Sequence, residues 1–187
     1  MRIAKKSLGQ NFLIDKNIFE KISKLLNIKN NIILEIGPGY GNLTDALITK
    51  KPKKLYLIEK DNNLSKFLKL KYKDHKNINI INMDFFDLDL SKFKNINIIS
   101  NLPYNISTRV ILYLFDYNTI INEMVFMIQK EVAIKFDYNL KDMNKYKFFT
   151  NIYSKYNKCF DVPPSVFRPK PKIKSSVVKF ILKKNII

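Results

Sequence analysis

The stretch that decides the fold is IILEIGPGYG, residues 32–41. A short apolar run leads into a turn with three glycines, which is typical of a buried parallel strand followed by a tight turn. Leu43, Ala46 and Leu47 follow at helical spacing, so a helix is expected directly behind the turn. The stretch therefore predicts one strand–turn–helix unit of an α/β fold.

The same alternation of strands and helices extends outward from this unit. Helical spacing of apolar residues occurs at 18–26, at 64–72, at 110–115 and from residue 132. Strand-like runs occur at 32–36, 54–59, 78–84, 96–101, 124–128, 151–153 and 176–182. Alternating elements predict a doubly wound, mostly parallel, seven-stranded sheet with helices on both faces. Ligands bind such sheets at the carboxyl ends of the strands.

Length and composition favour one globular domain, because the chain has 187 residues, of which 46% are hydrophobic and 27% charged. We expect a single domain over residues 1–187, with an N-terminal segment and helix at 1–30 and an α/β core at 31–187. No apolar run approaches the roughly 18 residues that a membrane span needs. The first residues have no apolar stretch of the kind found in secretory signals, so a cytoplasmic protein is expected.

The formal net charge is +18, which favours a polyanionic partner such as a nucleic acid. This is supporting evidence only, because lysine outnumbers arginine 31 to 3 and asparagine and isoleucine are also abundant. All three abundant residues have A/T-rich codons, so a biased genome gives the same excess.

The single cysteine, Cys159, and the single histidine, His75, limit the chemistry. They exclude a disulfide within the chain and a zinc site built from several cysteines. They also argue against a histidine metal cluster and a Ser-His-Asp triad. We therefore expect a reaction that needs neither a metal nor an imidazole.

The glycine turn itself favours a ligand without phosphates. Gly37, Gly39 and Gly41 are spaced G-x-G-x-G, which is neither the dinucleotide pattern nor a phosphate-binding loop with G-K-[ST]. Pro38 removes one amide donor that a diphosphate would use.

Carboxylates end the next two predicted strands. Glu59 ends the second strand, 22 residues after Gly37, where a carboxylate can accept both hydroxyl protons of a ribose. Asp84 ends the third, where a carboxylate can accept a hydrogen bond from an adenine amino group. Either acid alone is also consistent with a solvated strand end. Together with the glycine turn, they predict a nucleoside cofactor.

The tetrapeptide that ends the fourth predicted strand suits catalysis on an adenine amine; it consists of Asn101, Leu102, Pro103 and Tyr104. The lone pair of N6 is delocalised into the ring. An Asn carbonyl and a backbone carbonyl can each accept one N6 hydrogen, which frees the lone pair to attack a sulfonium methyl in line. Tyr104 can stack on an extracted base. A plain strand-to-loop turn with a packing tyrosine is the alternative.

These motifs, together with GQNFL at residues 9–13, resemble the ribosomal RNA adenine N6,N6-dimethyltransferase family, and the match runs from about residue 5 to 182. The resemblance implies S-adenosylmethionine as cofactor and no metal. It also implies that the N-terminal segment folds over the cofactor. The implied cofactor contacts are Asn11, Leu13, Gly37, Glu59, Asp84 and Asn101.

The family has two branches. One dimethylates two adjacent adenines in a hairpin loop near the 3′ end of small-subunit RNA; the other methylates one adenine of large-subunit RNA and confers macrolide resistance. The segments 129–133 and 162–169 are more similar to the first branch, so the expected partner is the small ribosomal subunit. The protein is expected to be a monomer. Phe167 is similar to an aromatic that covers the target base; the alternative is a core residue that anchors the loop.

Two departures from the family pattern are visible. Residues 135–150 lack its usual Tyr-Gly…Leu-Ser segment, and the chain stops at Ile187, where the family usually continues into a helical domain. That domain is therefore expected to be absent from this chain. A nonenzymatic RNA-binding assembly factor, and more weakly a DNA adenine methyltransferase, stay open as other functions.

Overall fold

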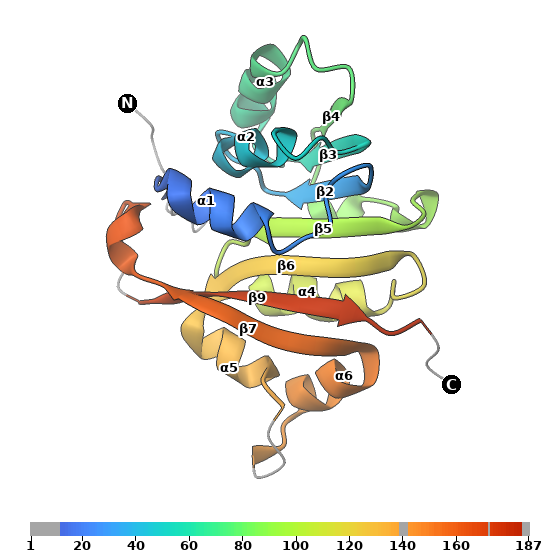
Figure 1. The fold of residues 1–187 in the computed structure, drawn as a ribbon, viewed down its shortest axis with the longest axis vertical. Helices are drawn as coiled ribbons and strands as arrows, with labels where there is room; N and C mark the ends of the chain where they lie inside the picture. Colours follow the sequence, from blue (N-terminus) through green and yellow to red (C-terminus); the bar gives the residue numbers. More distant parts are fainter. Residues whose placement is uncertain (1–11, 139–141, 172, 185–187) are drawn as a thin grey trace.

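The computed structural model describes residues 12–138, 142–171 and 173–184. Its centre is a seven-stranded sheet in the order β4-β3-β2-β5-β6-β9-β7 (Figure 1). Neighbouring strands from β4 to β6 are parallel, and β9 runs antiparallel to both β6 and β7. The strands are β2 (Ile32–Ile36), β3 (Lys54–Ile58), β4 (Ile78–Ile81), β5 (Ile96–Asn101), β6 (Ile121–Gln129), β7 (Ser154–Val162) and β9 (Ser175–Leu182).

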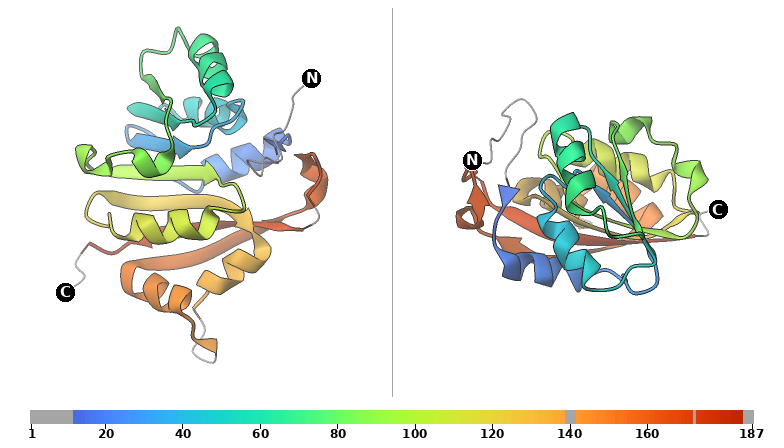
Figure 2. Two further views of the ribbon diagram at one scale, coloured as in Figure 1. Left: turned by 180° about the vertical axis from the view of Figure 1, so that it is seen from behind. Right: turned by 90° about the horizontal axis from the view of Figure 1, so that it is seen from above.

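Helices cover both faces of the sheet, as the two views of Figure 2 show. One face packs against α1 (Lys16–Ser23), α2 (Asn42–Ile48) and α3 (Asn62–Lys71). The other packs against α4 (Ser107–Phe115), α5 (Lys130–Phe136) and α6 (Lys145–Tyr153). The expected doubly wound, mostly parallel α/β sheet is confirmed.

Two apolar clusters hold these layers together, because side chains of a strand point alternately to opposite faces. In β2, Ile33 joins the cluster under α1 and α2, whereas Leu34 joins the cluster under α4 and α5; both are 0% exposed. β2 and β5 are buried on both faces, so even their polar residues Glu35, Asn97 and Ser100 are at most 3% exposed.

The order of elements near residue 150 differs from the sequence prediction. Residues 151–153 were expected to form a strand, but they are the last turn of α6, and β7 begins at Ser154. The Asn144 side chain accepts hydrogen bonds from the amides of Tyr146 and Lys147, which starts the helix at Lys145, nine residues before the strand. Tyr146 and Tyr153 then pack against the core at helical spacing. Tertiary packing overrides the strand propensity of this segment.

A second, two-stranded sheet was not predicted. It pairs β1 (Phe12–Leu13) with β8 (Phe167–Arg168) in antiparallel fashion, and a short 3-10 helix at Pro164–Val166 precedes β8. It joins the end of the N-terminal segment to the proline-rich loop. Among the residues that the structure describes, no helix is both long and apolar enough to cross a membrane.

Candidate active site

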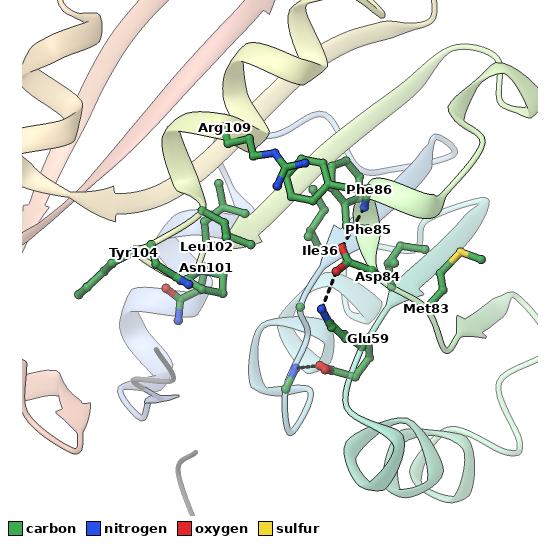
Figure 3. Close-up of a pocket in the computed structure, with 17 residues that line it drawn as sticks. Ile36, Glu59, Met83, Asp84, Phe85, Phe86, Asn101, Leu102, Tyr104 and Arg109 are labelled. Carbon is green, nitrogen blue, oxygen red and sulfur yellow. Dashed lines mark hydrogen bonds and ion pairs between the residues drawn. The ribbon is translucent and has the colours of Figure 1, made fainter. Parts of the chain in front are cut away.

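A cavity of about 400 Å³ lies at the carboxyl ends of the central parallel strands (Figure 3). Its walls come from the segments that follow β2, β3, β4 and β5 and from the start of α4. The lining residues are Ile36, Gly37, Gly39, Ile58, Glu59, Lys60, Met83, Asp84, Phe85, Phe86, Asn101, Leu102, Pro103, Tyr104, Asn105, Ile106 and Arg109.

The glycine turn and the Asn-Leu-Pro-Tyr turn are directly connected. β2 and β5 are parallel neighbours, and Glu35 pairs with Ile99 in their register. The buried Ser100 hydroxyl donates to the Ile36 carbonyl oxygen at 2.5 Å. Because Ser100 precedes Asn101 and Ile36 precedes Gly37, this hydrogen bond fixes the starting points of both turns relative to each other.

The glycine turn has left-handed backbone at all three glycines, with φ values of 63°, 60° and 77° at Gly37, Gly39 and Gly41. A Cβ added at Gly37 meets no heavy atom within 4 Å, so that face of the turn is open to a ligand. Non-glycine residues rarely adopt such φ values, which explains the repeated glycines.

The end of α3 clamps the far end of this turn. The Tyr72 hydroxyl lies 2.8 Å from the Gly41 carbonyl oxygen and 2.7 Å from Asp45 Oδ1. Lys71 Nζ donates to the Tyr40 carbonyl oxygen at 3.1 Å and to Asp45 Oδ2 at 2.7 Å. The turn is therefore held from outside the cavity, while its inner face stays open.

Gly41→Ala is expected to destabilise the fold more than Gly37→Ala. Both place a side chain at positive φ, which costs roughly 1–2 kcal/mol. Only at Gly41 does the new Cβ collide with the Tyr72 hydroxyl, which adds about 1–3 kcal/mol of overpacking. Urea unfolding measures both losses, and Tyr72→Phe should restore part of the Gly41→Ala loss. Equal losses at the two glycines would contradict the clamp.

Glu59 connects the second strand end to the glycine turn. Its Oε2 accepts from the Gly39 amide at 3.1 Å, and its Oε1 accepts from the Asp61 amide at 2.9 Å. The residue is 6% exposed, and burial raises the pKa of the carboxyl above its usual value. In Figure 3, Glu59 and Asp84 lie together on one side of the cavity.

Asp84 follows β4 and caps the short 3-10 helix at Phe85–Asp87. Its Oδ2 accepts from Lys60 Nζ at 2.7 Å and its Oδ1 from the Phe86 amide at 3.1 Å. These contacts, the Lys60 hydrogen bond first, hold the pKa of Asp84 below its usual value. Asp84 is therefore an ionised acceptor at neutral pH.

On the opposite side of the cavity, Figure 3 shows Asn101, Leu102 and Tyr104 together. The Leu102 amide donates to the Met127 carbonyl oxygen at 3.2 Å, which extends the β5–β6 pairing into the turn. Leu102 is 1% exposed and anchors the turn in the core. Asn101 and Tyr104 are half-buried and line the cavity.

Most of the site residues expected from the sequence line this one cavity: Gly37, Glu59, Asp84, Asn101, Leu102, Pro103 and Tyr104. Leu13 is not in the lining, but its carbonyl oxygen accepts from Asn42 Nδ2 at 3.1 Å, directly after the glycine turn. Asn11 lies outside the described residues. Phe167 is 0% exposed and packs in the same cluster as Leu13, which is the position of a loop anchor.

The sequence prediction missed one wall of the cavity, formed by Phe85, Phe86 and Arg109. The Arg109 guanidinium lies 3.9 Å from the centroid of the Phe86 ring, in a cation–π contact. The two aromatics directly follow Asp84, so the sequence could have predicted that they line the expected adenine site. Nothing in the sequence pattern singled out Arg109.

A buried acid, Glu35, lies behind the glycine turn. It is 2% exposed, and its Oε2 accepts from the Thr44 hydroxyl at 2.7 Å. Burial raises the pKa of Glu35 to about 8. Its carboxyl is therefore mainly protonated in the folded protein at neutral pH.

Glu35→Gln is expected to change how stability depends on pH. Between the ordinary pKa of 4.5 and the folded value of about 8, the folded protein binds the extra proton. The stability of the wild type therefore falls as pH rises, by about 1.4 kcal/mol per unit from this group. Glutamine cannot titrate, so the variant should gain on the wild type over this window. Urea unfolding at about pH 5 and about pH 8 tests this; a constant difference would contradict it.

Comparisons with known proteins agree with this geometry. The family model described as "Ribosomal RNA adenine dimethylase" matches residues 1–187. A "Ribosomal RNA small subunit methyltransferase A" of Pelagibacter ubique is 41% identical over 97% of this chain and 71% of its own length. A relative of the same description from Malacoplasma penetrans is 40% identical over 97% of this chain and 67% of its own.

Solved structures show the same fold. A dimethyladenosine transferase from Plasmodium falciparum superposes with a TM-score of 0.84 and 31% identity, over 92% of this chain and 64% of that one. The 23S rRNA methyltransferase ErmE gives a TM-score of 0.85 with 23% identity, over 94% and 71%. The fold is that of methyltransferases, and with the family match over its whole length this chain belongs to the ribosomal RNA adenine dimethylase family.

Proposed function

We propose that this protein transfers methyl groups from S-adenosylmethionine to N6 of two adjacent adenosines in small-subunit ribosomal RNA, giving N6,N6-dimethyladenosine. The target we propose is a hairpin loop near the 3′ end of that RNA. The observation that supports this proposal most is that the glycine turn and the Asn-Leu-Pro-Tyr turn line the same cavity. The Ser100–Ile36 hydrogen bond connects the two turns. Loop bases suit this cavity, because they can leave a stack at little cost.

The residues present fit the cofactor. Glu59 would accept the ribose hydroxyls, Asp84 the adenine amino group, and the open face at Gly37 leaves room for the rest. The bound cofactor supplies an electrophilic methyl group on a sulfonium. Glu59 also holds the Gly39 amide, so the same carboxylate shapes the turn and contacts the ligand.

The opposite side of the cavity handles the target base. The Asn101 side-chain oxygen and a backbone carbonyl of the turn would each accept one N6 hydrogen, which frees the nitrogen lone pair. The Tyr104 ring would stack on the base, and Pro103 stiffens the turn. These groups act by positioning and polar stabilisation.

The N-terminal segment would complete the site. We propose that residues 1–30 form a cofactor-covering segment and a helix, and that residues 31–187 form the catalytic α/β core. The position of Leu13 supports this, because its side chain is buried and its carbonyl oxygen accepts a hydrogen bond from Asn42 beside the glycine turn. Asn11 would then reach the cofactor. We also propose that the protein works as a monomer in the cytoplasm, on the small ribosomal subunit.

A large-subunit adenine methyltransferase is the second candidate. The fold does not separate the two, because ErmE superposes as well as the dimethyladenosine transferase. The sequence favours the small subunit: the relatives described as acting on it are about 40% identical, whereas ErmE is 23% identical. A nonenzymatic assembly factor has no need for the shared acid-lined cavity.

The test is methyl transfer to undermethylated small subunits, followed by mass mapping of the modified adenines. We expect dimethylation of two adjacent adenosines in one hairpin loop. Transfer to naked large-subunit RNA alone would move the assignment to the second candidate. RNA binding without any binding of S-adenosylmethionine in calorimetry would move it to an assembly factor.

A further inference from the structure

The Tyr104 phenol is held by a residue that neither the motif nor the cavity lining includes. Its hydroxyl lies 2.7 Å from the hydroxyl of Ser175, across 71 positions of the chain. Ser175 is 0% exposed, whereas Tyr104 is half-buried and lines the cavity. Burial raises the pKa of the Tyr104 phenol, so the phenol stays protonated at neutral pH.

Ser175 is a rigid anchor because its strand, β9, is paired with a neighbouring strand on each side. It is the first residue of β9, and it pairs with Gln129 of β6 on one side and Val162 of β7 on the other. The position of its hydroxyl is therefore set by the sheet and not by a loop.

The backbone of Tyr104 is fixed separately, by the start of α4. The Ser107 hydroxyl donates to the Tyr104 carbonyl oxygen at 3.2 Å, and the Ile106 amide donates to the Pro103 carbonyl oxygen at 3.2 Å. A tyrosine fixed at its backbone and at its hydroxyl oxygen points in one direction, which means that it keeps one χ1 rotamer. Without the Ser175 hydroxyl, only the backbone end is fixed and the side chain can adopt other χ1 rotamers.

We infer that Ser175 is a positioning residue for methyl transfer: it fixes the direction of the Tyr104 side chain, and so the place of the ring on which the target adenine stacks. This inference rests on the proposed function, because it assumes that a base stacks there. It explains why a tyrosine is useful at position 104, since a phenylalanine offers the same stacking face without the anchor. Ser175 acts only through Tyr104 and does not itself touch the base.

A double-mutant cycle in the full chain tests this inference. Ser175→Ala and Tyr104→Phe should each lower kcat on undermethylated small subunits by about tenfold, the scale of one lost hydrogen bond. The double variant should be no slower than either single one, because both remove the same contact. The Kd for S-adenosylmethionine should stay unchanged, and Ser175→Thr should retain most of the activity.

Ser176→Ala is the matched control. Ser176 is also 0% exposed in β9, but its hydroxyl donates to Asp161 Oδ1 at 2.7 Å, away from Tyr104. It should leave kcat unchanged. Multiplying effects in the double variant, or a Ser175→Ala kcat equal to that of Ser176→Ala, would overturn the inference.

A second readout does not need methyl transfer. In spectra of tyrosine-labelled protein, with Tyr104 assigned from the Tyr104→Phe variant, couplings to the Tyr104 Cβ hydrogens should show one χ1 rotamer in the wild type and an average over rotamers in Ser175→Ala. Ser176→Ala should match the wild type. If the wild type transfers no methyl groups but this difference is seen, the proposed function fails while the anchor stands. If the χ1 rotamer of Tyr104 is equally well defined in all three proteins, the anchor itself is wrong.

Discussion

Asn101→Ala is expected to lower kcat for methyl transfer by roughly 10²–10³-fold, the range found when one polar group that stabilises a transition state is removed. The Asn101 side chain lines the cavity opposite Glu59 and Asp84, where the amine of the target base would lie (Figure 3). Its oxygen would accept an N6 hydrogen most strongly as the nitrogen attacks, so the loss falls on kcat. Single-turnover transfer of labelled methyl groups to undermethylated small subunits measures it.

The cofactor affinity of this variant separates catalysis from binding. Asn101 is also an expected cofactor contact, but the larger contacts would come from Glu59 and Asp84, so calorimetry should show a change in Kd of less than about threefold. Asn63→Ala, on the exposed side of α3, is the control and should match the wild type in both measurements. Wild-type turnover in Asn101→Ala would refute the role assigned to Asn101.

Glu59→Gln is expected to raise the Kd for S-adenosylmethionine by about 10²-fold or more, from the loss of charge-assisted hydrogen bonds to two ribose hydroxyls. The carboxylate also accepts from the amides of Gly39 and Asp61. The amide nitrogen of glutamine would face one of these donors or a ribose hydroxyl, so the turn or the ligand loses a partner. Calorimetry with the cofactor alone measures the effect without any RNA.

The Glu59 assignment also predicts the direction in which cofactor affinity changes with pH. Burial raises the pKa of Glu59, whereas Lys60 lowers that of Asp84, so acidification neutralises the Glu59 carboxylate while Asp84 is still ionised. Wild-type affinity should therefore fall as pH drops towards the pKa of Glu59, and Glu59→Gln should lack this fall. Glu131→Gln, on an exposed residue outside the cavity lining, should keep the wild-type profile. An unchanged Kd in Glu59→Gln would contradict the ribose assignment.

The parallel strands and the acids at their ends could be predicted because each signal is local. The run at 96–101 corresponds to β5 residue for residue, since its isoleucines mark a buried strand and Pro103 stops it. Glu59 and Asp84 were found because carboxyl ends of parallel strands meet at one edge of the sheet. The structure brings both into the cavity with Asn101, while their ligand contacts stay predictions.

What could not be predicted depends on contacts between distant segments. The boundary between α6 and β7 was misplaced because residues 145–160 are rich in aromatic residues that suit either element. The Tyr72 clamp on Gly41 and the Ser175 anchor of Tyr104 join residues 31 and 71 positions apart. No periodicity encodes such pairs. The burial of Phe167 follows from the pairing of β1 with β8, which has only two residues in each strand.

The central claim is that one cavity holds a nucleoside cofactor with its reactive group facing the turn after β5. A crystal structure with S-adenosylhomocysteine tests this directly. The account predicts the ribose on Glu59, the adenine beside Asp84 and the sulfur facing Asn101. A ligand bound elsewhere, or in this cavity with its sulfur directed towards Phe86 and Arg109, would contradict it.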